Sequence, residues 1–130
     1  KTWPKQKLKN IAKNLNNQIP VFFIEKNKKK LIEEISSRVK KAIFPETNTS
    51  LSCPALITAL STRLKKAITI DNGIMHMMGL ANIPMITLFG PTNSEKFAPK
   101  KRNVIILDSK KLYNSNDISK ITETDVLREI

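Results

Sequence analysis

The sequence is poor in several residue types, and each shortage narrows the possible functions. Cys53 is the single cysteine, which excludes an internal disulfide and a cysteine-based metal cluster. Aromatic residues make up 5% of the chain, so few side chains are available to stack on nucleic-acid bases. No continuous apolar run approaches the ~20 residues of a membrane-spanning helix, and no secretory signal pattern is present. We therefore expect a cytoplasmic protein with no metal site.

Acidic residues are also scarce, and the chain carries a large positive charge. There are 11 acidic and 23 basic residues, which gives a net charge of +12. Such an excess can indicate binding to nucleic acid or to an anionic membrane surface. Most of the basic residues are lysines, and Lys5, Lys7, Lys9 and Lys13 alternate with apolar positions, as on the solvated face of a helix. We therefore expect no nucleic-acid partner. A nucleic-acid-binding domain stays open as an alternative that only the net charge supports.

Apolar patterns predict helices that alternate with strands. Leu8, Ile11, Ala12 and Leu15 share one face of a helix that Pro4 can begin. Further helices are predicted at 31–39, 54–64, 74–81 and 121–130, strands at 20–24, 42–44, 68–71, 85–89 and 103–107, and irregular segments at 93–102 and 110–120. This alternation predicts a single α/β domain over residues 1–130, with a Rossmann-like parallel sheet flanked by helices.

The stretch 68–92 contains the most informative pattern. An apolar run ends at Asp71 and Asn72, a short apolar helix follows, and a second apolar run ends before Thr92. This order predicts a strand–helix–strand crossover in a parallel sheet. Polar residues at the carboxyl ends of parallel strands face the ligand crevice, so we expect these three side chains to line a binding site.

Gly73 and His76 suggest that the ligand is an anion. Gly73 lacks a Cβ atom, which lets the backbone turn sharply and a ligand approach closely. Free amides of the first helical turn would then point at the ligand, and His76 in that turn could donate to a phosphate oxygen. The pattern alone also fits a simple turn followed by a core histidine.

Four motifs, taken together, resemble glycosyltransferase family 9, the lipopolysaccharide heptosyltransferase family. They are K-x-W-P at 1–4, D-x-G-x-x-H at 71–76, F-G-P-T at 89–92 and a closing helix at 121–130. The resemblance spans nearly the whole chain but only the carboxyl-terminal half of the family's two-domain GT-B architecture. It implies that the chain is a fragment whose amino-terminal acceptor domain is absent. It also implies a strand before the first motif, at the centre of the sheet.

The resemblance also assigns roles to two residues in the first part of the chain. Lys1 matches the lysine that meets the phosphates of the donor. Glu25 falls close to the acidic residue that accepts hydrogen bonds from the nucleotide ribose, although the glycine usually found nearby is absent.

Five further residues match the diphosphate site of the family. Gly73 and His76 are expected to contact the diphosphate, and Asp71 is expected to orient the loop because a carboxylate repels phosphate. Asn72 replaces the usual Ser or Thr, although its amide can still donate a hydrogen bond. Thr92 is expected to line the same crevice.

The activity implied by the resemblance is transfer of a heptose or related sugar from a nucleotide diphosphate sugar, expected to be ADP-linked. Transfer proceeds with inversion, without a metal or cofactor, onto a lipopolysaccharide-type glycolipid at the inner face of the inner membrane. The general base is implied to lie in the absent domain, so no residue of this chain is expected to be catalytic. The alternative is a Rossmann-like nucleotide-binding domain that has lost transferase activity, which the departures at Asn72 and Glu25 keep open.

Overall fold

The computed structural model describes residues 3–15, 17–24, 27–45, 54–70, 73–98 and 103–130. The chain divides into two compact units. The first, here called the sheet unit, comprises Lys1–Pro4 and Pro54–Ile130, and the second, here called the helical unit, comprises Lys5–Cys53.

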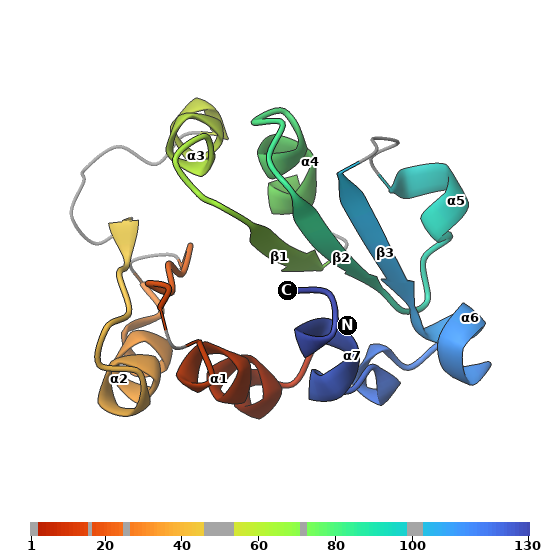
Figure 1. Cartoon of the computed structure of the whole chain (residues 1–130), viewed down its shortest axis with the longest axis horizontal. Coiled ribbons are helices and arrows are strands. Elements are labelled where there is room, and N and C mark those ends of the chain that lie inside the picture. The colour runs from red at the N-terminus through yellow and green to blue at the C-terminus, as the bar shows by residue number, and fades with distance from the viewer. Residues whose placement is uncertain (1–2, 16, 25–26, 46–53, 71–72, 99–102) are drawn as a thin grey trace. The chain divides into compact units, whose positions relative to one another are not determined.

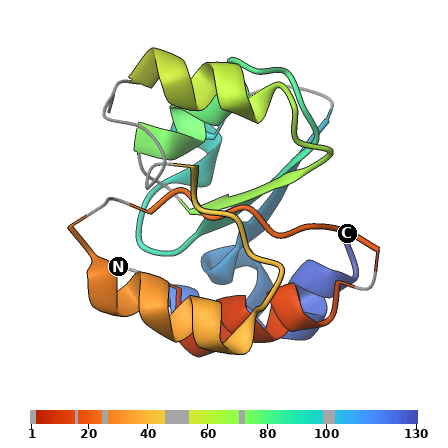
Figure 2. The same cartoon turned by 90° about the vertical axis from the view of Figure 1, so that its left-hand side faces the viewer.

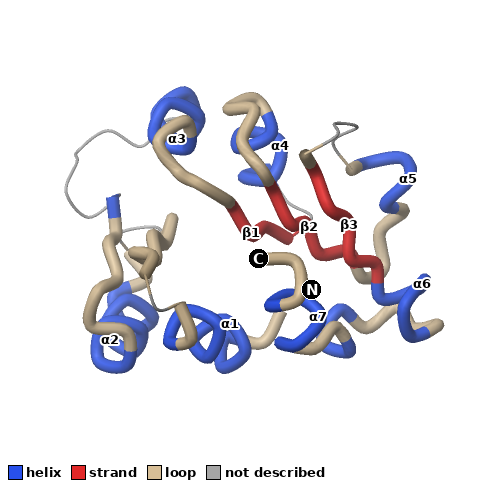
Figure 3. Tube along the Cα trace, in the orientation of Figure 1, coloured by secondary structure: helices blue, strands red, loops and turns tan. Residues whose placement is uncertain are grey.

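The sheet unit is built on three parallel strands in the order β1-β2-β3 (Figures 1 and 3). They are β1 (Ala67–Ile70), β2 (Met85–Phe89) and β3 (Val104–Asp108). Every residue of the central strand β2 is buried, as expected for the apolar run MITLF in the middle of a sheet. The sequence correctly predicted these three strands and their parallel pairing, and β3 lies at an edge as its position in the chain suggested.

The crossover from β1 to β2 is formed by α4 (Gly73–Gly79), which begins at the glycine that the sequence indicated. A turn follows the helix, and Asn82 adopts a left-handed backbone conformation there with φ 56°. Asparagine tolerates this conformation, which is common where a helix ends. The strand–helix–strand prediction for 68–92 is therefore confirmed.

Helices cover both faces of the sheet. Figures 1 and 2 show α3 (Pro54–Ser61) and α4 on one side, and α7 (Glu123–Leu127) on the other. Thr58 Oγ1 donates a hydrogen bond to the Met77 carbonyl at 3.0 Å, which ties α3 to α4. Met75 and Val126 are fully buried on opposite sides of the sheet. The observed α/β architecture thus has the predicted sheet with flanking helices.

The segment after β3 differs from its prediction. Residues 110–120 were expected to be irregular, yet α6 (Ser109–Tyr113) and the 3₁₀ helix η2 (Ile118–Lys120) lie there. Asp108 and Asp117 cap the two helices, because each carboxylate accepts a hydrogen bond from a backbone N–H two residues later. Similarly, Asn93 caps the short helix α5 (Ser94–Phe97) inside the segment 93–102, which was also predicted to be irregular.

The predicted closing helix is confirmed as α7. Thr122 and Asp125 form a capping box, in which each side chain accepts a hydrogen bond from the backbone N–H of the other residue. Immediately before it, the Ile121 carbonyl accepts a hydrogen bond from Trp3 Nε1 at 3.0 Å. The tryptophan of the K-x-W-P motif is therefore buried against the start of α7.

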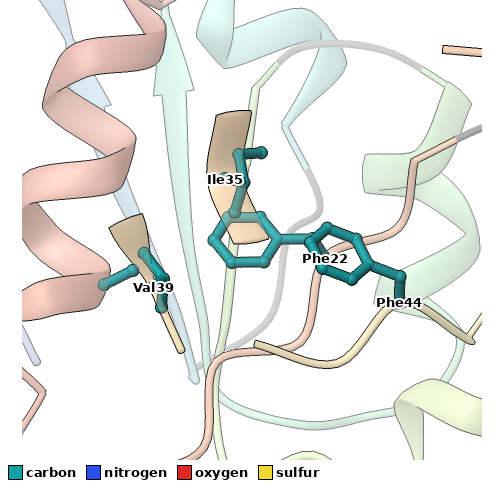
Figure 4. Close-up of a cluster of buried hydrophobic side chains, with 5 residues drawn as sticks. Phe22, Ile35, Val39 and Phe44 are labelled. Carbon is teal, nitrogen blue, oxygen red and sulfur yellow. The ribbon is translucent and has the colours of Figure 1, made fainter. Parts of the chain in front are cut away.

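The helical unit contains α1 (Lys5–Lys13) and α2 (Lys29–Arg38), both of which the sequence predicted. Its core is a cluster of buried apolar side chains, comprising Ala12, Phe22, Ile35, Val39 and Phe44. The rings of Phe22 and Phe44 are stacked with their centroids 5.7 Å apart. Figure 4 shows these two side chains beside each other in the cluster. Such aromatic pairs add to the stabilisation that burial alone provides.

Two predictions for this unit are wrong. The runs at 20–24 and 42–44 form only an isolated parallel bridge between Val21 and Ile43, and Figure 3 shows no strand in either run. A pair so short cannot extend, because Pro20 lacks an N–H group and Pro45 follows the second run. Lys9 was expected on a solvated helix face, yet it is buried and pairs with Glu34 at 3.3 Å.

Candidate functional site

The carboxyl ends of the three strands lie along one edge of the sheet. The strands end at Ile70, Phe89 and Asp108. A turn at 90–92 follows β2, and α6 begins directly after β3. In parallel sheets this edge is where ligands bind. We therefore located each predicted site residue relative to this edge.

Four of the predicted site residues lie outside the described part of the chain. They are Lys1, Glu25, Asp71 and Asn72. Their assignments therefore stay predictions. The described residues in the predicted set are Gly73, His76 and Thr92.

His76 lies in α4, one turn after Gly73 begins the helix at the carboxyl end of β1. Its neighbours Met75 and Met78 are buried, whereas His76 is exposed. The helix therefore uses the methionines for packing and leaves the imidazole accessible. A core histidine, the alternative that the sequence left open, is excluded.

Thr92 lies in the turn that follows β2, together with Gly90 and Pro91. Two backbone carbonyls of this turn accept hydrogen bonds from the ammonium group of Lys110. One is the Thr92 carbonyl, at 2.7 Å from Nζ, and the other is the Gly90 carbonyl. The backbone conformation of the turn is thus fixed by a side chain from α6.

Asp108, at the end of β3, connects Lys110 to a second part of the same loop. Its carboxylate is 3.3 Å from Lys110 Nζ and accepts hydrogen bonds from Ser94 Oγ at 2.6 Å and from the Lys110 backbone N–H at 2.9 Å. Burial tends to raise the pKa of this carboxyl group. The hydrogen bonds from Ser94 and Lys110, with the positive charge of Lys110, outweigh burial and hold the pKa below its ordinary value.

Gly90 allows a further close contact at this edge. A Cβ atom at this position would lie 2.9 Å from Ile118 Cβ and 3.0 Å from the Asn116 carbonyl oxygen. Only a glycine permits the segment before η2 to approach the turn so closely. The turn after β2 is therefore packed against the residues around Ile118 and is also hydrogen-bonded to Lys110.

The sequence analysis missed Ser94, Asp108 and Lys110. The signal that could have identified Asp108 is the rule applied to Asp71 and Thr92, namely a polar residue directly after an apolar strand. Lys110 follows Asp108 by two residues and was assigned to an irregular segment. Ser94 had no signal, because its contact with Asp108 joins residues 14 positions apart.

The described residues form neither a metal site nor a membrane-spanning helix. Among them, no group of three or more His, Cys, Asp or Glu side chains is placed to hold a metal ion. No helix in the described ranges is long and apolar enough to cross a membrane.

Several solved structures share this fold. A glycosyl transferase family 9 protein from Veillonella parvula DSM 2008 matches 99% of this chain and 41% of its own, with a TM-score of 0.79 and 20% identity. The E. coli ADP-heptose LPS heptosyltransferase II matches 99% of this chain and 40% of its own, with a TM-score of 0.77 and 21% identity. E. coli heptosyltransferase WaaC with ADP matches 98% of this chain and 38% of its own, with a TM-score of 0.79 and 15% identity.

These matches correspond to the carboxyl-terminal portion of the solved enzymes. The chain spans about two fifths of their length. Comparison with curated protein sequences finds no significant match. The sequence pattern of Glycosyltransferase family 9 (heptosyltransferase), in contrast, matches residues 1–127, which is nearly all of the chain. With the parallel sheet and the exposed histidine at its carboxyl edge, this match shows that the chain belongs to glycosyltransferase family 9.

Proposed function

We propose that this chain is the donor-binding domain of a glycosyltransferase and holds the diphosphate of an ADP-linked sugar at the carboxyl edge of the sheet. The complete enzyme then transfers a heptose or related sugar, with inversion and without a metal, to a lipopolysaccharide-type glycolipid. We place this reaction in the cytoplasm, at the inner face of the inner membrane. Membership of the family and the likeness to WaaC with ADP support the proposal.

The exposed position of His76 is the observation that carries this proposal. It lies one helical turn beyond the end of β1, at the edge where parallel sheets bind ligands. An accessible imidazole in this position can donate a hydrogen bond to a phosphate oxygen. Packing does not require a histidine there, because the buried methionines of α4 already fill the core.

The role of this domain in the reaction is electrostatic. When the bond between the sugar and the diphosphate breaks, negative charge develops on the departing diphosphate. His76, and Lys1 by its place in the K-x-W-P motif, stabilise that charge, which lowers the energy of the transition state. The base that deprotonates the acceptor hydroxyl belongs to a second domain.

The remaining predicted residues bind or orient the donor. Glu25 accepts hydrogen bonds from the ribose hydroxyls, and Asn72 donates to the diphosphate. Asp71 orients the segment that leads into α4, and Thr92 lines the crevice from the end of the neighbouring strand.

The proposal is tested by measuring ADP affinity calorimetrically for the parent protein and for His76→Ala. We expect the parent to bind ADP and the variant to bind it about tenfold to a hundredfold more weakly, as for the loss of one hydrogen bond to a charged group. The melting temperature should hardly change, because His76 is exposed. Leu80→Ala is the control, since Leu80 follows the same helix and is 74% exposed.

Three outcomes would contradict the proposal. The first is a parent protein with no affinity for ADP, and the second is a His76→Ala protein that binds ADP as tightly as the parent. A variant that melts early while keeping its affinity would assign His76 a structural role instead.

A further inference from the structure

The ammonium group of Lys110 lies among three oxygen acceptors. They are the carbonyls of Gly90 and Thr92, and the carboxylate of Asp108 at 3.3 Å. A lysine ammonium has three N–H donors, so these three acceptors match its full capacity. Lys110 is therefore held by the protein through two hydrogen bonds and one ion pair.

The contacts of Lys110 join the two strand ends that border the candidate site. Gly90 and Thr92 follow β2, whereas Asp108 ends β3. The loop after β2 is also tied at its far end, where Ser94 Oγ donates to Asp108 at 2.6 Å. Both ends of the loop are thus attached to the same buried carboxylate, once directly and once through the lysine.

These contacts have a consequence for an anionic ligand. Backbone carbonyl oxygens carry partial negative charge and repel phosphate oxygens. Lys110 binds the carbonyls on either side of Pro91, so these two oxygens are directed at an ammonium group. With the carbonyls held in this way, the position of Thr92 at the site edge is determined by Lys110.

We propose that Lys110 is a positioning residue for donor binding, which acts by holding the Gly90–Thr92 turn. This role rests on the proposed function, because it assumes that a nucleotide diphosphate binds at this edge. The lysine does not contact the donor. It fixes the turn from which Thr92 contacts the donor, and Asp108 keeps the ammonium group in place.

The test compares two adjacent lysines that carry the same charge. Lys110→Met removes the contacts to the turn. Lys111→Met removes an equal charge from a side chain that is 60% exposed and forms an ion pair with the exposed Glu95 at 3.2 Å. We expect Lys110→Met to weaken ADP binding about tenfold or more, as for one lost charged hydrogen bond, and Lys111→Met to leave it unchanged. Affinity is measured at a temperature where circular dichroism shows every variant folded.

A double-mutant cycle with Thr92→Ala separates positioning from general destabilisation. If Lys110 acts through Thr92, the Lys110→Met change should cost less affinity in the Thr92→Ala background than in the parent. A merely structural lysine would lower the melting temperature and give no such coupling in ADP affinity. Lys110→Arg restores the charge and two or more donors, so it should recover part of the lost affinity.

Each contrary result has a defined meaning. If the parent fails to bind ADP, the proposed function and this inference both fail. If the parent binds ADP, three results overturn the inference alone: unchanged affinity in Lys110→Met, an equal loss in Lys111→Met, or additive effects in the cycle. If Lys110→Met does not fold, Asp108→Asn replaces it, because it removes the carboxylate that keeps the ammonium group in place. Unchanged ADP affinity in a folded Asp108→Asn protein would then overturn the inference.

Discussion

Asp108 keeps a charged carboxylate at a position that is 3% exposed. Because its pKa in the folded protein is lower than its ordinary value, the charged form stabilises the fold. This stabilisation is fully present above the pKa of about 3.9 expected for an unfolded aspartate. It is lost as the pH falls through the lower pKa of the folded protein. The difference in acid stability between the parent and a variant that lacks this carboxylate should therefore report on Asp108.

We expect Asp108→Asn to lower the free energy of unfolding by about 1–3 kcal/mol at pH 7, because Ser94 and Lys110 lose a charged partner. The difference between parent and variant should shrink as the pH falls below about 4. Urea unfolding followed by circular dichroism between pH 7 and 3 measures both. Glu95→Gln is the control, since its side chain is 76% exposed. A parent–variant difference that stays constant down to pH 3 would contradict this account.

At the scale of the elements, α7 depends on the capping box at its start. Thr122 accepts a hydrogen bond from the Asp125 N–H at 3.1 Å, and Asp125 accepts one from the Thr122 N–H at 2.9 Å. The helix has only five residues, yet it places Val126 in the core with no exposed surface. So short a helix has little intrinsic stability and relies on its cap and its packing.

We expect Thr122→Ala to reduce the free energy of unfolding by about 1 kcal/mol, the usual cost of losing an N-cap side chain. Thr122→Ser keeps the hydroxyl group and should retain most of the stability. Thr124→Ala is a matched control, because Thr124 is exposed within the same helix and alanine is a better helix former. Equilibrium urea unfolding of the four proteins gives the comparison. Equal losses at positions 122 and 124 would show that the cap contributes nothing.

Most elements could be predicted because the apolar pattern and the breaking residues agree locally. The run 85–89 is apolar at every position except Thr87 and is bounded by Pro84 and Gly90, and it forms β2 with the predicted ends. The prediction of an irregular segment at 110–120 was wrong because the helices there do not depend on a repeating apolar face. They depend on aspartate caps and on one buried residue, Ile118. The predicted strands at 20–24 and 42–44 are reduced to the bridge between Val21 and Ile43, because strand length depends on pairing partners distant in sequence.

The part of the candidate site that lies within one local motif could be predicted from the sequence. Gly73 and His76 occur within four residues, so their placement on α4 follows from the crossover pattern. The Lys110 contacts to the turn after β2 cross 18 and 20 positions in the chain. No periodicity in a single sequence specifies which lysine reaches which carbonyl. Contacts of this kind require the three-dimensional arrangement.

For the whole molecule, the net charge of +12 raises the question of nucleic-acid binding. Several lysines have partners within the protein, since Lys9 pairs with Glu34 and Lys66 donates to the Glu129 carbonyl at 2.9 Å. Others, such as Lys28, Lys29 and Lys30 at the start of α2, are exposed to solvent. We interpret the charge as a solvated surface.

We therefore expect weak binding to duplex DNA at physiological salt. Fluorescence anisotropy of a labelled duplex, measured from about 50 to 200 mM salt, tests this, because phosphate contacts give a steep salt dependence. A single-stranded oligonucleotide of the same length is the control for non-specific attraction. Tight duplex binding that ADP does not displace would favour a nucleic-acid-binding domain instead.

The hydrogen bond from Trp3 to the Ile121 carbonyl joins positions 118 residues apart. The helical unit lies between them in sequence, and its buried cluster is complete by Phe44. During synthesis on the ribosome, the local contacts of the helical unit can form early, whereas the hydrogen bond from Trp3 Nε1 cannot form until Ile121 has emerged. Closing so long a loop costs chain entropy before any contact offsets it, and contacts of this range slow folding. This hydrogen bond of Trp3 is therefore among the last to form, and we expect the sheet unit to be the slower part of this protein to fold.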